Sequence, residues 1–156
     1  MPHIKNEDYL NVAVEAALAA SRIIMAALDK PRIAKYKGKA DLVTETDYLS
    51  EKMIKAIIRA SYPDHGLLAE ESEQESSQSD FLWIIDPLDG TTNFVHGYPC
   101  FAVSIGLFFQ NKPLIAVVLE IIKSARCTFA KSPPGTTVGG WLLMETLNAV
   151  GHQSTN

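Results

Sequence analysis

Residues 81–92 read FLWIIDPLDGTT, a run of apolar residues that ends in an acidic turn. The first five residues are apolar and predict a buried strand that ends at Asp86. Pro87 stiffens the following turn and Gly90 lets it bend, so the carboxylates of Asp86 and Asp89 can face one pair of metal ions. Backbone N–H groups of the same turn can then face an anion.

A second acidic strand end lies upstream of this turn. Gly66–Glu71 is a short apolar run that ends in Glu70 and Glu71. Carboxylates that leave adjacent strands at one edge repel one another unless protons or cations neutralise them. Oxygen ligands of this kind select magnesium, calcium or manganese rather than zinc. Each acidic stretch taken alone also fits an ordinary turn or a solvated strand end, whereas their combination predicts a divalent-metal site.

Two segments before these strands have helical periodicity. From Asn6 to Leu28, apolar residues recur at helical spacing within Ala-rich sequence. A second helix is expected from about Asp47 to Ser61, with Thr46 as its cap. Asp47 at that helix start is expected to hydrogen-bond the hydroxyl of Thr91, which would orient a water molecule. Lys35, Lys37 and Lys39 lie just upstream and are interpreted as a solvated basic loop, although one of them would be able to lend positive charge to the site.

The rest of the chain has the pattern of a β-meander. Phe101–Phe109 and Leu114–Ile122 flank a turn, and Arg126–Ala130 is interpreted as a third strand. Two helices followed by adjacent strands predict an α+β fold in which both helices pack on an antiparallel sheet. Residues 1–130 are expected to form this domain, and residues 131–156 a divergent or disordered tail, because the tail opens with a Ser-Pro-Pro-Gly breaker.

Composition limits the classes of partner and compartment. The 156 residues contain 14 Lys and Arg against 18 Asp and Glu, a net charge of −4 that argues against a nucleic-acid partner. The longest mainly apolar runs fall well short of the roughly 20 residues that a membrane-spanning helix needs, so no membrane partner is expected. The polar, acidic start of the chain is unlike a secretory segment. These features predict a cytoplasmic protein, or a plastid protein if a transit peptide is missing from this chain.

Three separate motifs carry a resemblance to a known family. They are DLVTETD at 41–47, AEES at 69–72 and WIIDPLDGTTNFVHGYP at 83–99. In this order they resemble the inositol monophosphatase family, most of all its plant-plastid and cyanobacterial branch. The resemblance implies a layered sandwich of helices and sheets, of which this chain would be the N-terminal portion. It also implies magnesium dependence, lithium sensitivity and a homodimer.

The resemblance implies the metal ligands as well. Glu70, Asp86 and the backbone carbonyl of Leu88 would bind one Mg²⁺. Asp86 and Asp89 would bind a second, with Asp86 bridging the two ions.

The same resemblance gives the catalytic and substrate-binding residues. Asp47 and Thr91 would position and deprotonate the attacking water, and the N–H groups of Gly90 and Thr91 would bind the phosphate. The residues expected to contact the substrate are Glu70, Leu88, Asp89, Gly90 and Thr91.

The expected function is magnesium-dependent hydrolysis of a phosphate monoester by a metal-activated water. Inositol monophosphate, a small phosphorylated polyol, is the expected substrate, and histidinol phosphate or another small phosphate ester is the alternative. A third hypothesis is a truncated, non-catalytic metal-binding fragment. It arises because family members carry a further metal-binding aspartate in a Trp-Asp motif, whereas Trp141 precedes Leu142, and because the resemblance weakens after about Ile121.

Overall fold

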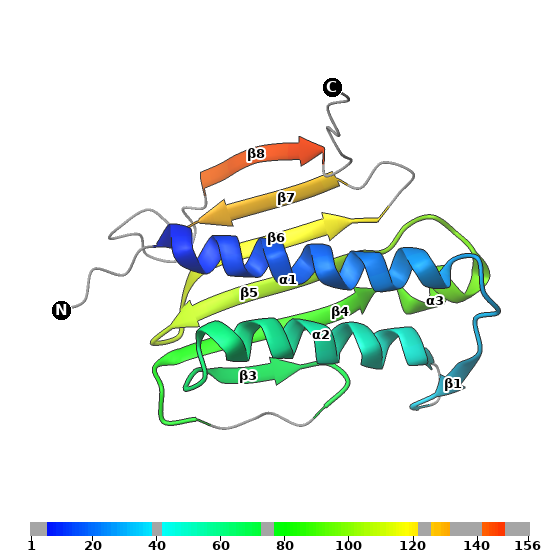
Figure 1. The fold of residues 1–156 in the computed structure, drawn as a ribbon, viewed down its shortest axis with the longest axis horizontal. Coiled ribbons are helices and arrows are strands. Elements are labelled where there is room, and N and C mark those ends of the chain that lie inside the picture. The colour runs from blue at the N-terminus through cyan, green and yellow to red at the C-terminus, as the bar shows by residue number, and fades with distance from the viewer. Residues whose placement is uncertain (1–5, 39–41, 73–76, 122–125, 132–141, 149–156) are drawn as a thin grey trace.

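A computed structural model describes residues 6–38, 42–72, 77–121, 126–131 and 142–148, and within them two long helices lie on one face of a six-stranded sheet (Figure 1). The helices are α1 (Asn6–Ala27), α2 (Glu45–Ser61) and the short α3 (Thr91–His96). The six strands are β3 (Gly66–Ala69), β4 (Phe81–Asp89), β5 (Ala102–Phe109), β6 (Lys112–Glu120), β7 (Arg126–Lys131) and β8 (Leu142–Asn148). A separate two-stranded ribbon pairs β1 (Ala34–Tyr36) with β2 (Leu42–Thr44).

The predicted α+β arrangement of two helices on a sheet is confirmed, but the sheet is mixed. Strands β4 to β8 are antiparallel neighbours in chain order, whereas β3 runs parallel to β4. The expectation of a purely antiparallel sheet was therefore wrong for this first pair. The two strands run the same way, with Ala69 of β3 opposite Ile85 of β4. As a result, β3 and β4 end at the same edge.

The meander agrees with the sequence pattern at its first strands. Strand β7 matches the third strand that Arg126–Ala130 predicted. Strand β8 pairs antiparallel with β7 and lies in the stretch 131–156, for which the sequence predicted a divergent or disordered tail. The Ser-Pro-Pro-Gly breaker at 132–135 lies outside the described residues.

The core lies between the helices and the sheet. The face of α1 that meets β5 and β6 is made mostly of small residues, so the helix backbone approaches the strands closely. The buried residues of this helix are Leu10, Ala13, Ala16, Ala17, Ala20, Ser21 and Ile24. Among the described helices, α1 is long and apolar enough by composition to span a membrane. In this fold, that apolar face packs instead on β5, β6 and α2.

A histidine lies inside an aromatic cluster at the start of β4. The imidazole of His65 stacks on the rings of Tyr62 and Phe81, with centroids 4.8 and 4.4 Å away. Its Nδ1 accepts a hydrogen bond of 3.0 Å from the indole N–H of Trp83, a fully buried side chain. A buried indole N–H needs such an acceptor, and only the form of His65 with an unprotonated Nδ1 supplies one.

Burial lowers the pKa of His65 below its ordinary value, with Arg59 acting in the same direction and Asp64 against it. As the pH falls below about 6.5, the unfolded chain therefore takes up this proton before the folded chain does, and stability is lost. We predict that the free energy of unfolding of the wild type decreases more between about pH 8 and about pH 5 than that of His65→Gln, which keeps an acceptor that does not titrate. Urea denaturation at each pH measures this difference. His96→Gln changes an exposed histidine of α3 and should follow the wild type; identical profiles for all three proteins would contradict the prediction.

Candidate active site

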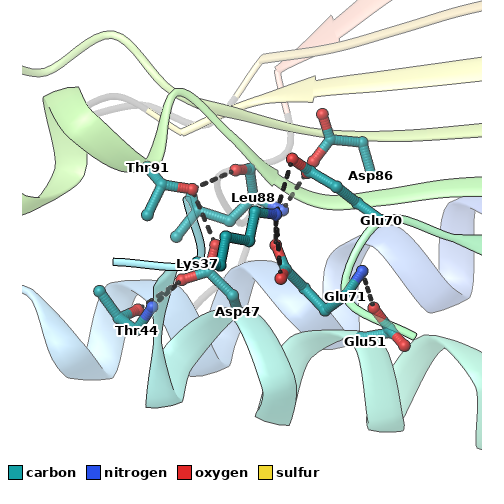
Figure 2. Close-up of polar contacts among 9 residues, drawn as sticks. All are labelled: Lys37, Thr44, Asp47, Glu51, Glu70, Glu71, Asp86, Leu88 and Thr91. Carbon is teal, nitrogen blue, oxygen red and sulfur yellow. Dashed lines mark hydrogen bonds and ion pairs between the residues drawn. The ribbon is translucent and has the colours of Figure 1, made fainter. Parts of the chain in front are cut away.

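The parallel register brings together the two acidic strand ends that the sequence singled out. Ala69 is the partner of Ile85 in the ladder, and the N–H of Glu70 donates to the carbonyl of Ile85 at 3.2 Å. The side chains of Glu70 and Asp86 consequently lie next to each other (Figure 2). Burial, then Glu70 and Asp89, raise the pKa of Asp86 to about 7. The carboxylates are thus crowded enough for one of them to hold a proton near neutral pH.

The end of β4 leaves the regular ladder immediately after Asp86. The pairing with β5 shifts register between Asp86 and Asp89, and the N–H of Leu88 turns back to the carboxylate of Asp86 at 3.2 Å. The chain then passes through Gly90 at a φ of +89°, where a Cβ would lie 2.8 Å from the carbonyl oxygen of Cys100. Only glycine fits this position, since a side chain would meet both an unfavourable backbone region and backbone atoms.

Asp47 connects α2 to this turn. Its Oδ1 accepts a hydrogen bond of 2.8 Å from the Thr91 hydroxyl, as the sequence predicted. Its Oδ2 accepts from the N–H and the hydroxyl of Thr44, at 2.8 and 2.5 Å. Asp47 is fully buried, so these donors provide the compensation that a buried carboxylate needs.

Thr44 is the N-cap of α2, and the expectation that Thr46 caps the helix was wrong. Thr44 and Asp47 form a reciprocal capping box, with the side chain of each bonded to the backbone of the other. The cap therefore lies two residues earlier than expected, because the side chain of Asp47 reaches back to the N–H of Thr44.

Two protein oxygens face the hydroxyl of Thr91. Besides Asp47, the carbonyl of Leu88 lies 3.0 Å from Thr91 Oγ1. A hydroxyl carries one proton, so that proton is directed to these two oxygens and the lone pairs remain available to accept a hydrogen bond from water. This polarity suits a residue that orients a nucleophilic water.

Lys37 supplies positive charge to the site, which is the alternative that the sequence left open beside a solvated basic loop. Its Nζ lies 3.2 Å from Oε1 of Glu70, and 2.9 and 3.1 Å from the two carboxylate oxygens of Glu71. Burial alone would lower the pKa of Lys37, but the hydrogen bonds to Glu71 and Glu70 raise it above its usual range. Burial in turn raises the pKa of Glu71, and Lys37 partly offsets this. Lys37 is therefore a cation of this site, although the sequence did not show which of Lys35, Lys37 and Lys39 would reach it.

The predicted residues converge on one small open pocket of about 190 Å³. Its lining consists of Lys37, Leu42, Glu70, Asp86, Leu88, Asp89, Gly90, Thr91 and Thr92. Asp47 lies behind Thr91 and reaches the pocket through that hydroxyl. A larger hollow of about 350 Å³ beside the end of α1 is lined mainly by apolar and basic residues and holds none of these carboxylates.

The donor set of this pocket fits a hard divalent cation. Glu70, Asp86 and Asp89 offer carboxylate oxygens and Leu88 offers a carbonyl, which are the ligands that Mg²⁺ prefers. Burial is the largest cause of the raised pKa of Asp86, and the neighbouring carboxylates of Glu70 and Asp89 raise it further. Among the described residues, no three Asp, Glu, His or Cys side chains lie close enough together to ligate an ion as they stand. The ammonium group of Lys37 provides the positive charge next to Glu70 instead.

Comparison with known proteins identifies the family. A sequence model described as the inositol monophosphatase family matches residues 5–155. The chain belongs to the inositol monophosphatase family. The match continues past Ile121, after which the resemblance read from the sequence alone was weaker.

The relatives of this protein are longer than the chain itself. Phosphatase IMPL1, chloroplastic, of Arabidopsis thaliana is 44% identical over 134 residues, which are 85% of this chain and 36% of that protein. Inositol-1-monophosphatase of Synechocystis sp. is 48% identical over 114 residues, 72% of this chain and 40% of that protein. The crystal structure of the extragenic suppressor protein suhB from Bartonella henselae has a TM-score of 0.78 at 36% identity, covering 87% of this chain and 52% of that one. The chain thus spans between 36% and 52% of these relatives.

We predict that Asp47→Ala lowers the free energy of unfolding by about 2–4 kcal/mol, from the lost cap and the buried donors left without an acceptor. Urea denaturation with chelator present measures this loss without any contribution from metal. Glu45→Ala removes an exposed acid from the same helical turn and should cost no more than about 0.5 kcal/mol. A loss below about 1 kcal/mol for Asp47→Ala would show that its hydrogen bonds do not hold the turn.

A further prediction concerns the pH dependence of the metal-free chain. Because the pKa of Asp86 rises from 3.8 to about 7 on folding, the folded chain keeps a proton that the unfolded chain releases. This contribution to stability is present below about pH 4 and lost as the pH rises to about 7. We expect Asp86→Asn to lose less stability than the wild type over that range, measured by urea denaturation in chelator. Asp80→Asn, at the exposed beginning of the same strand, should behave as the wild type; a parallel loss in all three proteins would refute the prediction.

Proposed function

We propose that this chain provides the metal-binding and water-activating part of a magnesium-dependent phosphomonoesterase. The observation that carries the proposal is the convergence of Glu70, Asp86 and Asp89 on one pocket that also contains Thr91, itself bonded to buried Asp47. A carboxylate cluster of this charge repels phosphate by itself and attracts it once divalent cations are bound. Bound Mg²⁺ would polarise the phosphate and lower the pKa of a coordinated water.

The residues of this chain take defined roles in that reaction. Glu70, Asp86 and the Leu88 carbonyl would hold one ion, and Asp86 with Asp89 would hold a second. Thr91, whose proton is directed inward, would accept a hydrogen bond from the attacking water, and the carboxylate of Asp47 behind it would stabilise the proton that is released. Hydrolysis by direct attack of water needs no covalent intermediate on the protein.

The phosphate would lie at the beginning of α3. Gly90 and Thr91 line the pocket, and the first N–H groups of a helix have no partner within it. These N–H groups would therefore be available to the phosphate oxygens. Glu70, Leu88 and Asp89 would contact the same substrate.

Inositol monophosphate is the proposed substrate, because relatives named for phosphatase and inositol monophosphatase activity match this chain at 44% and 48% identity. Histidinol phosphate or another small phosphate ester of the same superfamily is kept as the alternative substrate. We extend to this chain the predictions of lithium inhibition, a homodimer, and the absence of nucleic-acid and membrane partners. A cytoplasmic or plastid location is likewise a prediction, the latter in keeping with the name of the Arabidopsis relative.

Phosphate release from inositol 1-phosphate, with and without Mg²⁺, tests the proposal. We predict magnesium-dependent turnover that decreases at least about 100-fold in Asp86→Asn and Glu70→Gln, since ligand loss should cost no less than the loss of a residue that orients a ligand. Asp80→Asn is the matched control at the other end of β4 and should keep wild-type turnover. Calorimetric Mg²⁺ binding without turnover would favour the non-catalytic fragment, and the absence of both would refute the proposal.

A further inference from the structure

Glu51 is a buried carboxylate of α2 that no step of the proposed reaction uses. It lies four residues after Asp47, which puts both side chains on one face of the helix, one turn apart. Both are buried, Glu51 with 5% of its surface exposed. A carboxylate in this position is costly unless it is paired and hydrogen-bonded, so its partners indicate what it does.

One partner of Glu51 lies just after β3, and the other lies one turn further along α2. Its Oε2 accepts a hydrogen bond of 2.9 Å from the backbone N–H of Glu71 (Figure 2). Its Oε1 forms an ion pair with Lys55 at 3.3 Å, and the Lys55 ammonium donates to the hydroxyl of Ser72. Glu51 and its counter-ion therefore reach two of the residues that follow Ala69, the last residue of the strand.

This bond matters because Glu70 cannot be held by its own packing. The side chain of Glu70 is 45% exposed, whereas that of its neighbour Glu71 is 2% exposed. Lys37 bonds the side chain of Glu70, while the backbone of Glu70 is bonded on one side to the Ile85 carbonyl and on the other side, through the N–H of Glu71, to Glu51. Without the second bond, the chain after Glu70 would be held only through the side chains of Glu71 and Ser72, by Lys37 and Lys55, among the contacts of the described residues.

We propose that Glu51 is a positioning residue that sets the direction of Glu70, and that with Asp47 it makes α2 a two-point clamp on the site. Asp47 bonds the turn after β4 through Thr91, and Glu51 bonds the chain after β3 through Glu71. Because both carboxylates project from one rigid helix about 6 Å apart along its axis, the two strand ends keep a fixed spacing. The link from this spacing to Mg²⁺ affinity rests on the proposed function, whereas the clamp itself does not.

Two variants of the full chain separate positioning from a purely structural role. Glu51→Gln keeps an oxygen that can accept from Glu71, and Glu51→Ala removes it. We expect Mg²⁺ binding, measured by calorimetry, to weaken about 10–100-fold in Glu51→Ala and to return to within about 3-fold of wild type in Glu51→Gln. Glu45→Ala, on the exposed part of the same helix, is the control and should bind Mg²⁺ as the wild type does.

Amide hydrogen exchange followed by NMR gives a readout that needs no metal. In Glu51→Ala, the amides of Glu70 and Glu71 should both exchange faster, while that of Leu68 within β3 stays protected. Unchanged protection of Glu70, or Mg²⁺ affinity equal to wild type in a folded Glu51→Ala, would overturn the proposal. Equal weakening in Glu51→Gln and Glu51→Ala would also overturn it, because charge rather than the hydrogen bond would then matter.

The shorter Glu51→Asp keeps the inference testable if Glu51→Ala does not fold. It withdraws the carboxylate by one methylene group and should also speed the exchange of both amides and weaken Mg²⁺ binding; a folded variant with neither effect would overturn the clamp. If the wild type itself binds no Mg²⁺, the proposed function fails, while the amide exchange of Glu70 still decides whether Glu51 positions it.

Discussion

Glu70 follows the last residue of β3 and faces Asp86 near the end of the parallel strand β4, and Asp89 is the last residue of β4. Bringing these carboxylates together costs free energy unless positive charge accompanies them. The protein meets this cost in two ways that are visible in the structure. Asp86 has a pKa raised to about 7, and the ammonium group of Lys37 contacts Glu70 and Glu71. A site with these properties is suited to bind a divalent cation.

The helix α2 turns this crowded sheet edge into an ordered site. Its amphipathic packing against β4 places one face over the strand ends, and that face carries the buried carboxylates of Asp47 and Glu51. Each accepts hydrogen bonds from a segment that follows a different strand. Asp47 and Glu51 do not line the pocket, but their hydrogen bonds hold Thr91 and the backbone next to Glu70, two residues that do line it.

Much of this arrangement could be predicted from local sequence. The apolar run before Asp86, the Pro87 and Gly90 turn and the acids after Ala69 predicted the strand ends, and helical periodicity predicted α1 and α2. The errors concern features that depend on partners distant in sequence or on exact side-chain reach. The sequence predicted Thr46 as the N-cap of α2, but the Asp47 carboxylate bonds Thr44 instead. The parallel pairing of β3 was absent from the predicted fold class, because strand direction depends on the path of the connecting chain.

The sequence by itself determined the family, the two-helix and strand order, and the identities of the acids at the strand ends, because each of these is encoded in residue types at short spacing. The tertiary structure alone decided how these pieces meet. It placed Lys37 against Glu70 and Glu71, 33 and 34 residues away, and Glu51 against the backbone of Glu71, 20 residues away. Such contacts depend on how α2 and the segment after β1 lie against the residues that follow β3. The periodicity of the sequence does not encode that geometry.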